Sequence, residues 1–481
     1  MLTCLPWAEF ISSTCGDQHY FPIEHPEKLN SFRKADFDEI AAGWKKTLSL
    51  MREGAAPPEI GLYLNWPLGP LNSALLQIEA VKKEVKFLQN IFKEANFTSL
   101  HIGGGSPSYL PDNELDGFLS YLKSSFKIQK GAQVYAEITQ PMPSVSQLNI
   151  LLGFGFNHIT LRVDSFDEAL SESWGGAREI KRQAADIFDL LARAAGVSAE
   201  IDLMIGARGQ TESILRQDVR QAFSFHPQCV YLYSQEDAPH TLFPREKKDH
   251  LWLEDDALAH SFSSAADALS QEFGYVRCQA DWKNLSLYPL QKEQEAGWRR
   301  SRASTLGIGF GTLSHAFGSL WYYHGGEFRD RVRDGLVPDF YSMGSSSEEE
   351  MRGYVIEVLS RGPKVSREAF RALFKRDILD VGALSGSLLS LNQSKIVSIS
   401  ERFIEWADID SPTRAVWLKS LYSPTMIKTL FKSAAPLFRD FSENFSRQGS
   451  NWREYYLKKN SALKHKYCRI YYKVGENASV S

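Results

Sequence analysis

The chain has 481 residues, 43% of them hydrophobic, and carries 55 basic against 58 acidic residues, for a formal net charge of −3. This length allows a large core and roughly two or three domains, and the balanced charge gives no sign of a nucleic-acid-binding surface. No run of about 18 apolar residues would span a membrane. The N-terminus shows no export signal, so we expect a cytoplasmic protein.

The cysteines are too far apart for a structural metal site or a disulfide scaffold. They contain no CxxC pair, which favours free or buried thiols in a reducing compartment. Three histidines, His101, His158 and His315, are also isolated in the sequence, and we interpret each as a packed or surface residue rather than a metal ligand. The five cysteines are Cys4, Cys15, Cys229, Cys278 and Cys468.

In chain order, a mixed extension from Met1 to Pro58 precedes a run of strand–helix alternations. Repeated β–α units predict a parallel sheet with crossover helices, either an open sheet or a barrel. The expected strands are Ile60–Asn65, Phe97–Ile102, Val134–Thr139, His158–Val163, Ser198–Ile205 and Cys229–Tyr233. The expected helices are Ala74–Glu94, Asp112–Phe126, Ser144–Gly153, Ala177–Ala195 and one beginning at Thr211.

The pattern changes after Ser345, where a serine and glutamate run leads into helical segments that continue to Lys464. We therefore predict three parts: an N-terminal extension (1–58), a barrel with its own extension (59–344) and a mostly α-helical C-terminal domain (345–481).

A glycine turn follows the expected strand Phe97–Ile102. Gly103, Gly104 and Gly105 can take positive φ and can bring bare N–H groups close to a ligand. Such turns also occur without any ligand, so the spacing alone leaves both interpretations open. Ligands of parallel α/β proteins gather at the carboxyl ends of the strands. The glycine turn and Asp164 fall at such ends.

Several segments, taken in order, resemble one family. They are the glycine turn, Gly155–Asp167, Ile201–Gly206 followed by Gly209–Thr211, and Leu306–Gly311. Together they resemble the radical S-adenosylmethionine enzymes of the oxygen-independent coproporphyrinogen III oxidase type and the related haem chaperones, from about Ile60 to Pro338. The resemblance implies an α/β fold: a partial (β/α)6 TIM-like barrel with an N-terminal extension and a mostly α-helical C-terminal domain.

The chain departs from this family at its most characteristic motif. The family's first strand runs into CxxxCxxC, whose thiolates hold a 4Fe-4S cluster. Here the corresponding positions are Gly69, Ser73 and Leu76. We therefore expect no cluster at this loop and no cluster-driven radical chemistry.

The resemblance also assigns a cofactor site. It implies that the turn Gly103–Gly105, with Ser106, holds the amino group of S-adenosylmethionine, helped by Glu137. Asp202 would line the same mouth of the barrel. Asp164 stands where the family has a glutamine. The family's arginine for the ligand carboxylate corresponds to Gly176, unless Arg178 replaces it.

Three interpretations remain open. In the first, the chain binds S-adenosylmethionine without a cluster and performs polar methyl or alkyl transfer, with Asp164 as the base. In the second, it is a non-catalytic relative that binds a tetrapyrrole, another substrate or a partner enzyme. In the third, an unrecognised cluster makes it a true radical enzyme. The first is favoured slightly. Two aromatic stretches, Trp298–Arg300 and Trp321–His324, suit either a planar acidic ligand or the core and its rim.

Overall fold

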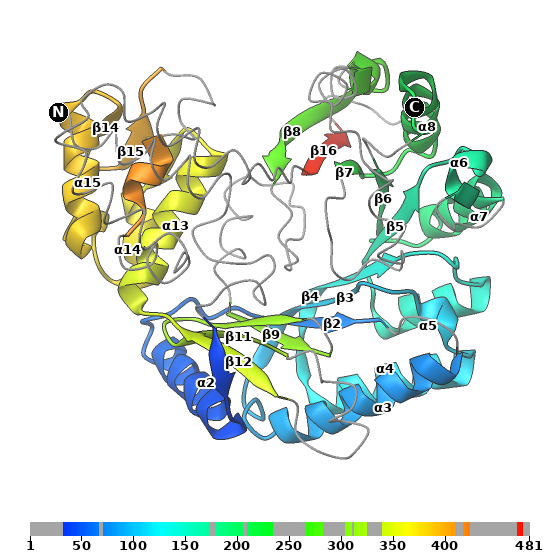
Figure 1. The fold of residues 1–481 in the computed structure, drawn as a ribbon, viewed down its shortest axis with the longest axis horizontal. Coiled ribbons are helices and arrows are strands. Elements are labelled where there is room, and N and C mark those ends of the chain that lie inside the picture. Colours follow the sequence, from blue (N-terminus) through cyan, green and yellow to red (C-terminus); the bar gives the residue numbers. More distant parts are fainter. Residues whose placement is uncertain are drawn as a thin grey trace.

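The computed structural model describes residues 32–66, 71–173, 179–204, 209–233, 265–266, 268–281, 304–309, 312–324, 339–408, 417–423 and 469–474. The strands of these residues form a 13-stranded sheet and a separate three-stranded sheet. The large sheet curves into an arc, and helices cover its outer face (Figure 1).

The centre of the large sheet is the predicted parallel unit. Six neighbouring strands run parallel, and helices alternate with them along the chain, so the predicted partial (β/α)6 barrel is confirmed. The strands are β2 (Ile60–Asn65), β3 (Asn96–Gly103), β4 (Lys127–Ile138), β5 (His158–Asp164), β6 (Ser198–Met204) and β7 (Cys229–Tyr233). The helices are α3 (Leu71–Leu88), α4 (Asp112–Ser125), α5 (Val145–Phe154), α6 (Glu168–Ser173), α7 (Ile180–Ala192) and α8 (Glu212–Ser224).

Strands from distant parts of the chain extend this unit at both edges. Beyond β2 lie β9 (Ser304–Ile308), β10 (Leu313–Ala316), β11 (Leu320–His324), β12 (Phe340–Gly344) and β1 (Arg33–Ala35); β9 is parallel to β2, and the others form antiparallel pairs. Beyond β7 lie β16 (Arg469–Val474) and β8 (Tyr275–Asp281). The helix α2 (Phe37–Arg52) packs on β10 and β11. The N-terminal segment thus adds a strand to the large sheet and a helix that packs on it. The division of the chain into three parts stays a prediction.

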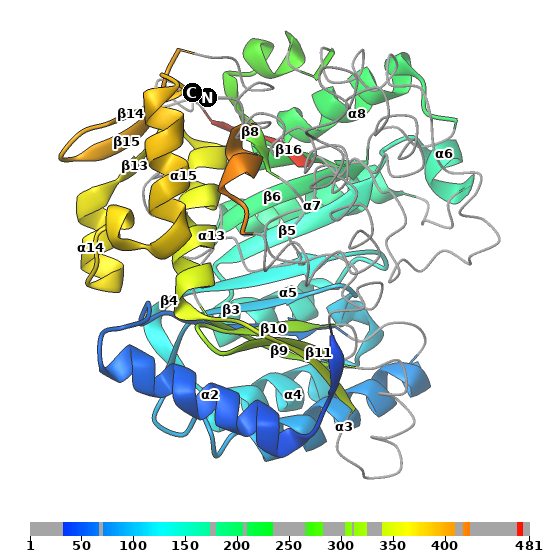
Figure 2. The same cartoon turned by 60° about the vertical axis from the view of Figure 1, so that its left-hand side comes forward.

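The C-terminal part combines helices with a small sheet. Its elements are α13 (Ser347–Arg361), β13 (Lys364–Ser366), α14 (Arg367–Phe374), η3 (Ile378–Asp380), α15 (Gly382–Gln393), β14 (Val397–Ile399), β15 (Phe403–Trp406) and η4 (Lys419–Leu421). Figure 2 shows this part, in yellow and orange, beside the strands β9, β10 and β11. The sequence predicted the helical character but not the sheet β13–β15–β14, because strands of three or four residues are too short to show a period of two.

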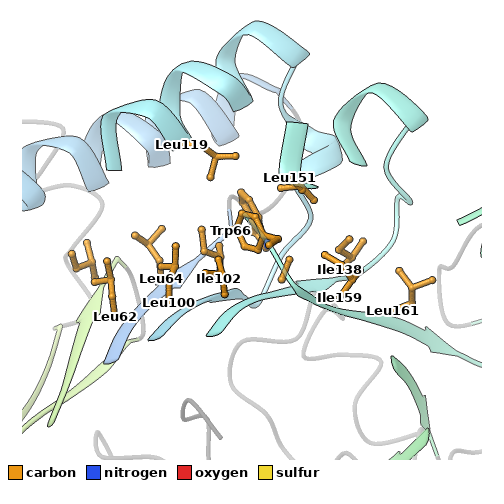
Figure 3. Close-up of a cluster of buried hydrophobic side chains, with 14 of the residues drawn as sticks. Leu62, Leu64, Trp66, Leu100, Ile102, Leu119, Ile138, Leu151, Ile159 and Leu161 are labelled. Atoms are coloured by element: carbon orange, nitrogen blue, oxygen red, sulfur yellow. The ribbon is translucent and has the colours of Figure 1, made fainter. Parts of the chain in front are cut away.

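The main hydrophobic core lies between the parallel strands and the outer helices. Alternate strand residues such as Leu62, Leu100 and Leu161 lie on the helix-covered face of the sheet, where they share one buried hydrophobic cluster with Leu119 of α4 and Leu151 of α5 (Figure 3). Because side chains alternate across a strand, the residues between these apolar ones point to the inner face of the arc. The core therefore fixes which side chains line the barrel interior.

Most predicted element boundaries agree with the structure, and the main exceptions are the end of α3 and the first half of β4. The expected helix Ala74–Glu94 is wrong at its end, because α3 stops at Leu88. The chain then turns so that Phe92 is buried against Trp44, with ring centroids 4.8 Å apart. The helix expected from Ser144 does begin there, since Ser144 and Gln147 form a reciprocal capping box.

Candidate functional site

The inner face of the parallel strands is lined by polar and aromatic side chains. They occupy the alternate positions left by the core residues, and most of them are largely buried. They are Tyr63 on β2, His101 on β3, Tyr135 and Glu137 on β4, His158, Thr160 and Arg162 on β5, and Glu200 and Asp202 on β6.

Four of these residues form a ladder of rings across β2 to β5. Tyr63, His101, Tyr135 and His158 are successive register partners on neighbouring strands. The ring centroids are 5.2, 5.7 and 4.2 Å apart in that order, and Tyr135 stacks on His158 with an interplanar angle of 19°. Tyr63 meets His101 edge-on, with an interplanar angle of 68°, so the ladder combines one stacked pair with edge and tilted contacts and fixes the orientation of all four rings.

The glycine turn lies at the carboxyl end of β3 and faces two polar side chains. A Cβ at Gly103 would lie 2.9 Å from Glu137 Oε2, and one at Gly104 would lie 2.8 Å from Asn65 Oδ1. Gly104 also has a φ of 82°, which favours glycine. The absence of side chains at both positions therefore makes room for the Glu137 carboxylate and the Asn65 amide beside the turn.

The remaining residues of the predicted turn are buried. Ser106 caps the short 3₁₀ helix η2 (Pro107–Tyr109), and its hydroxyl donates to Pro141 O at 2.7 Å. Gly105 is buried beside it. The ligand role of these two residues stays a prediction, and the bonds of Ser106 show that its hydroxyl already holds the turn to the loop after β4.

Two glutamates of the inner face approach histidines. His101 Nε2 lies 3.2 Å from Glu137 Oε1. His158 Nδ1 lies 3.8 Å from Glu200 Oε1, and the other oxygen of Glu200 accepts a hydrogen bond from Thr160 Oγ1 at 2.9 Å. Both histidines pack against tyrosine rings of the ladder, as the sequence predicted, and both also lie beside glutamates of the inner face.

Arg162 lies between two of the predicted acids. Its Nε is 4.0 Å from Asp164 Oδ1, and its backbone register partner on β6 is Asp202. Asp164 ends β5 at a register shift and has a φ of 66°, in the left-handed region where aspartate is one of the more frequent residues. Asp164 and Asp202 are thus brought to one part of the inner face, while Glu137 and the glycine turn lie on the neighbouring strands.

The charges of β4 and β5 act on one buried phenol. Burial, and after it the Glu137 carboxylate, raises the pKa of Tyr63, while Arg162 acts in the opposite direction. The Tyr63 phenol therefore stays protonated at neutral pH and can donate a hydrogen bond within the site.

A buried carboxylate on α8 holds the loop that follows Asp164. Asp218 accepts hydrogen bonds from Ser165 Oγ at 2.7 Å and from Phe166 N at 2.8 Å. Burial raises the pKa of Asp218 to about 6, although both hydrogen bonds lower it. This contact fixes the backbone immediately after the residue predicted to be the base.

Asp218 should make the stability of the protein depend on pH. In the folded protein the Asp218 carboxyl group keeps its proton up to about pH 6, whereas in the unfolded chain it releases the proton near pH 4. The stabilisation that this proton gives the folded protein is therefore complete below about pH 4, and it is lost as the pH rises through 6. Asparagine does not titrate. The stability of Asp218→Asn, measured relative to the wild type, should therefore be about 2–3 kcal/mol higher at pH 7 than at pH 4.

Chemical denaturation of both proteins at the two pH values checks this expectation. Asp189→Asn, which changes an exposed aspartate of α7, is the control. A stability difference between Asp218→Asn and wild type that stays constant with pH would contradict the assignment.

Parts of the sequence-based site lie outside the described residues. Gly176 and Arg178, which bear on the ligand carboxylate, are among them, as are Gly69 and the stretch Trp298–Arg300. Of the other cluster positions, Ser73 lies in the first turn of α3 and accepts a hydrogen bond from Gln77 Nε2 at 3.1 Å, while Leu76 is 64% exposed. Among the described residues, no group of three or more His, Cys, Asp or Glu side chains is arranged to hold a metal ion.

The second aromatic stretch, on β11, belongs to the core. Trp321 stacks on His315 with ring centroids 3.9 Å apart. The Tyr322 hydroxyl accepts a hydrogen bond from Trp44 Nε1 at 3.0 Å, and His324 is buried against Glu84. The interpretation of Trp321–His324 as core and rim residues is therefore confirmed, and so is that of His315 as a packed residue.

No protein-family model matches the chain. The oxygen-independent coproporphyrinogen III oxidase of Salmonella typhimurium is 24% identical over 176 residues, which cover 36% of this chain and 37% of that protein. The haem chaperone HemW of Lactococcus lactis is 26% identical over 157 residues, or 33% of this chain and 41% of that protein. The chain is a relative of these proteins. The matched segments span less than half of either relative's length.

The coproporphyrinogen oxidase fold extends over most of the chain. The structure of the Escherichia coli enzyme HemN, a radical SAM enzyme, superposes with a TM-score of 0.61 at 16% sequence identity, and it covers 78% of this chain and 93% of HemN. The curved parallel sheet and its outer helices thus have the HemN fold.

Proposed function

We propose that the chain binds S-adenosylmethionine at the glycine turn without an iron–sulfur cluster and uses it in polar methyl or alkyl transfer. The observation that carries this proposal is the Glu137 carboxylate beside the bare backbone of Gly103. A carboxylate in a largely buried place suits an ammonium group, since the ion pair offsets the loss of water from both partners.

The turn fits the amino end of this cofactor. A Cβ at Gly103 would meet Glu137, so the glycine keeps the carboxylate close to the bare backbone of the turn, and Asn65 adds an amide oxygen beside Gly104. When bound, S-adenosylmethionine supplies an electrophilic sulfonium carbon, so the protein must hold it and align a nucleophile.

The positions that correspond to the cluster cysteines do not fit a 4Fe-4S cluster. Such a cluster needs thiolates, whereas Ser73 carries a hydroxyl and Leu76 an exposed alkyl group. The third position is Gly69. We therefore assign no step of the reaction to a cluster.

The inner face supplies groups that could move a proton from an acceptor. Asp164 lies at the carboxyl end of β5, where its loop is held by Asp218, and we propose that it accepts the proton of the incoming nucleophile. Asp202, one strand away, would keep the acceptor near the same end of the barrel.

A second candidate function is a non-catalytic protein that keeps the fold and binds a tetrapyrrole, another small molecule or a partner enzyme. The observation that favours it is Gly176, which leaves the position of the family's carboxylate-binding arginine without a charge.

In either case we place the protein in the cytoplasm. Among the described residues, no helix combines the length and the apolar character that crossing a bilayer requires.

Calorimetric titration of the iron-free protein with S-adenosylmethionine tests the proposal, together with metal analysis of an anaerobic sample. Saturable binding without iron supports it. No binding and no iron favours the second candidate, to be tested next with haem. An iron-loaded protein with cluster absorption would overturn both.

The variant Glu137→Gln should weaken binding of S-adenosylmethionine about tenfold to a hundredfold, because it removes a charge-assisted hydrogen bond to the ammonium group. Calorimetry of the variant measures this change. Glu114→Gln, which removes a charge from the first turn of α4, is the control and should bind like the wild type. Equal affinities of Glu137→Gln and wild type would show that the amino group lies elsewhere.

A further inference from the structure

We propose that the inner face has a second binding site, formed by Glu200 and His158, which holds the ammonium group of a small primary amine. The site is separate from the glycine turn. In the proposed function this amine is the acceptor molecule, so the inference rests on that function for the role of the ligand but not for its binding. It adds the chemical class of the second substrate.

Glu200 is a buried carboxylate that has no lysine or arginine partner among the described residues. Its side chain is 4% exposed. Oε2 accepts a hydrogen bond from Thr160 Oγ1 at 2.9 Å. Oε1 has longer contacts, to Ser198 Oγ at 3.5 Å and to His158 Nδ1 at 3.8 Å, and both exceed the ordinary hydrogen-bond distance. A buried charge is costly unless it is paired, so a ligand cation beside Oε1 would stabilise the site.

His158 presents a second polar atom to the same place. Its Nδ1 is buried and has no hydrogen-bond partner in the described part of the chain, while its ring is held by stacking on Tyr135. Nδ1 and Glu200 Oε1 are 3.8 Å apart, so both can lie about 2.9 Å from one nitrogen atom between them. An ammonium group has three N–H donors. It can therefore bond to both atoms and to the Ser198 hydroxyl.

The charge of the inner face favours a cation over a neutral ligand or water. Between the glycine turn and β6, this face carries four described carboxylates, those of Glu137, Asp164, Glu200 and Asp202, and one described arginine, Arg162. A surface lined mainly by one sign of charge attracts ligands of the opposite sign. A water molecule could reach the same atoms, but it would leave the Glu200 charge without a partner.

The register of the strands places this site within reach of the cofactor. Glu137, Thr160 and Glu200 are successive register partners on β4, β5 and β6. Two strand spacings are about 9.5 Å, so a molecule anchored at Glu200 can extend across β5 toward the glycine turn. The His158 side chain is 17% exposed, more than that of Glu200, which indicates that the ligand enters past His158.

A set of ligands that differ in charge and in N–H donors tests the inference. The wild type would be titrated by ligand-observed NMR with butylamine, with the uncharged butanol and with butyltrimethylammonium, which is charged but has no N–H. We expect the amine to bind at least about tenfold more tightly than the other two. Glu200→Gln should weaken binding of the amine about tenfold to a hundredfold. Glu168→Gln, at an exposed glutamate of α6, is the control and should bind it normally.

Titrations with S-adenosylmethionine separate this inference from the proposed function. Glu200→Gln should bind S-adenosylmethionine within about threefold of the wild type. If Glu200→Gln binds butylamine as tightly as the wild type, the inference is overturned and the proposed function is not affected. If the amine binds through Glu200 but S-adenosylmethionine does not bind, the proposed function is overturned and the amine site is supported.

Two further results decide the location of the amine. If Glu137→Gln loses butylamine binding, or if S-adenosylmethionine blocks it, the amine occupies the glycine turn and the inference is overturned. Should Glu200→Gln fail to fold, His158→Phe replaces it, because this variant keeps a ring against Tyr135 but removes Nδ1. It should bind butylamine about threefold to tenfold more weakly and S-adenosylmethionine normally. Unchanged affinity for the amine would overturn the inference.

Discussion

Replacing Glu84 with alanine is expected to destabilise the protein by about 3–5 kcal/mol, because it leaves two buried polar groups without their partner. Glu84 Oε1 lies 2.5 Å from His324 Nε2, and its other oxygen accepts a hydrogen bond from Gly309 N at 2.9 Å. Both Glu84 and His324 are almost completely buried. This network joins α3 to the turn after β9 and to the end of β11.

The threonine that completes the network fixes the histidine's hydrogens. Thr312 Oγ1 donates its single hydrogen to Gly309 O at 2.8 Å. It must therefore accept the hydrogen of His324 Nδ1, which lies 3.2 Å away. Glu84→Gln keeps an oxygen for Gly309 and an N–H for His324 Nε2, so it should cost much less than Glu84→Ala.

Chemical denaturation of the variants measures these differences. Glu79→Ala on the same helix is the control, because Glu79 is exposed and pairs with Lys82 at the surface. Its cost should stay below about 1 kcal/mol. If Glu84→Ala costs no more than Glu79→Ala, the buried network does not hold α3 in place.

The fold was predictable to the extent that it depends on local pattern. The strand Ile60–Asn65 and the strand Cys229–Tyr233 are confirmed at both ends, since each is an apolar run between residues that break the pattern. The first half of β4, Lys127–Gly131, is mostly exposed and polar. Its first two residues, Lys127 and Ile128, pair with Asn96 and Phe97 of β3 before a register shift, and no local signal in the sequence indicates that pairing.

The site was predictable only in part for the same reason. Glu137 and the glycine turn follow from the resemblance, and the structure places them side by side. His158, Thr160 and Arg162 were missed as a group. Their signal was present, because polar residues at every second position of a buried strand indicate a polar inner face. The contact between Glu84 and His324, by contrast, joins residues 240 positions apart, which no local pattern reveals.

Replacing Gly103 with alanine should impair ligand binding while changing stability little. The added Cβ would lie 2.9 Å from Glu137 Oε2, and the carboxylate can move away because it is the end of a flexible side chain. The move takes the negative charge from the place proposed for the ligand ammonium. We therefore expect affinity for S-adenosylmethionine to fall about tenfold to a hundredfold, as measured by calorimetry.

A matched glycine and a double variant make this test specific. Gly117→Ala on α4 introduces a Cβ with no atom within 4 Å, so it should leave binding unchanged and stabilise the helix slightly. If Gly103→Ala acts by displacing Glu137, it should have little further effect in a protein that already carries Glu137→Gln, and the two losses should not add. Additive losses would mean that Gly103 contributes through its own backbone and that Glu137 contacts the ligand independently. Unchanged affinity in Gly103→Ala would place the ammonium away from this turn, because no ligand group at that position could tolerate the displaced carboxylate without cost.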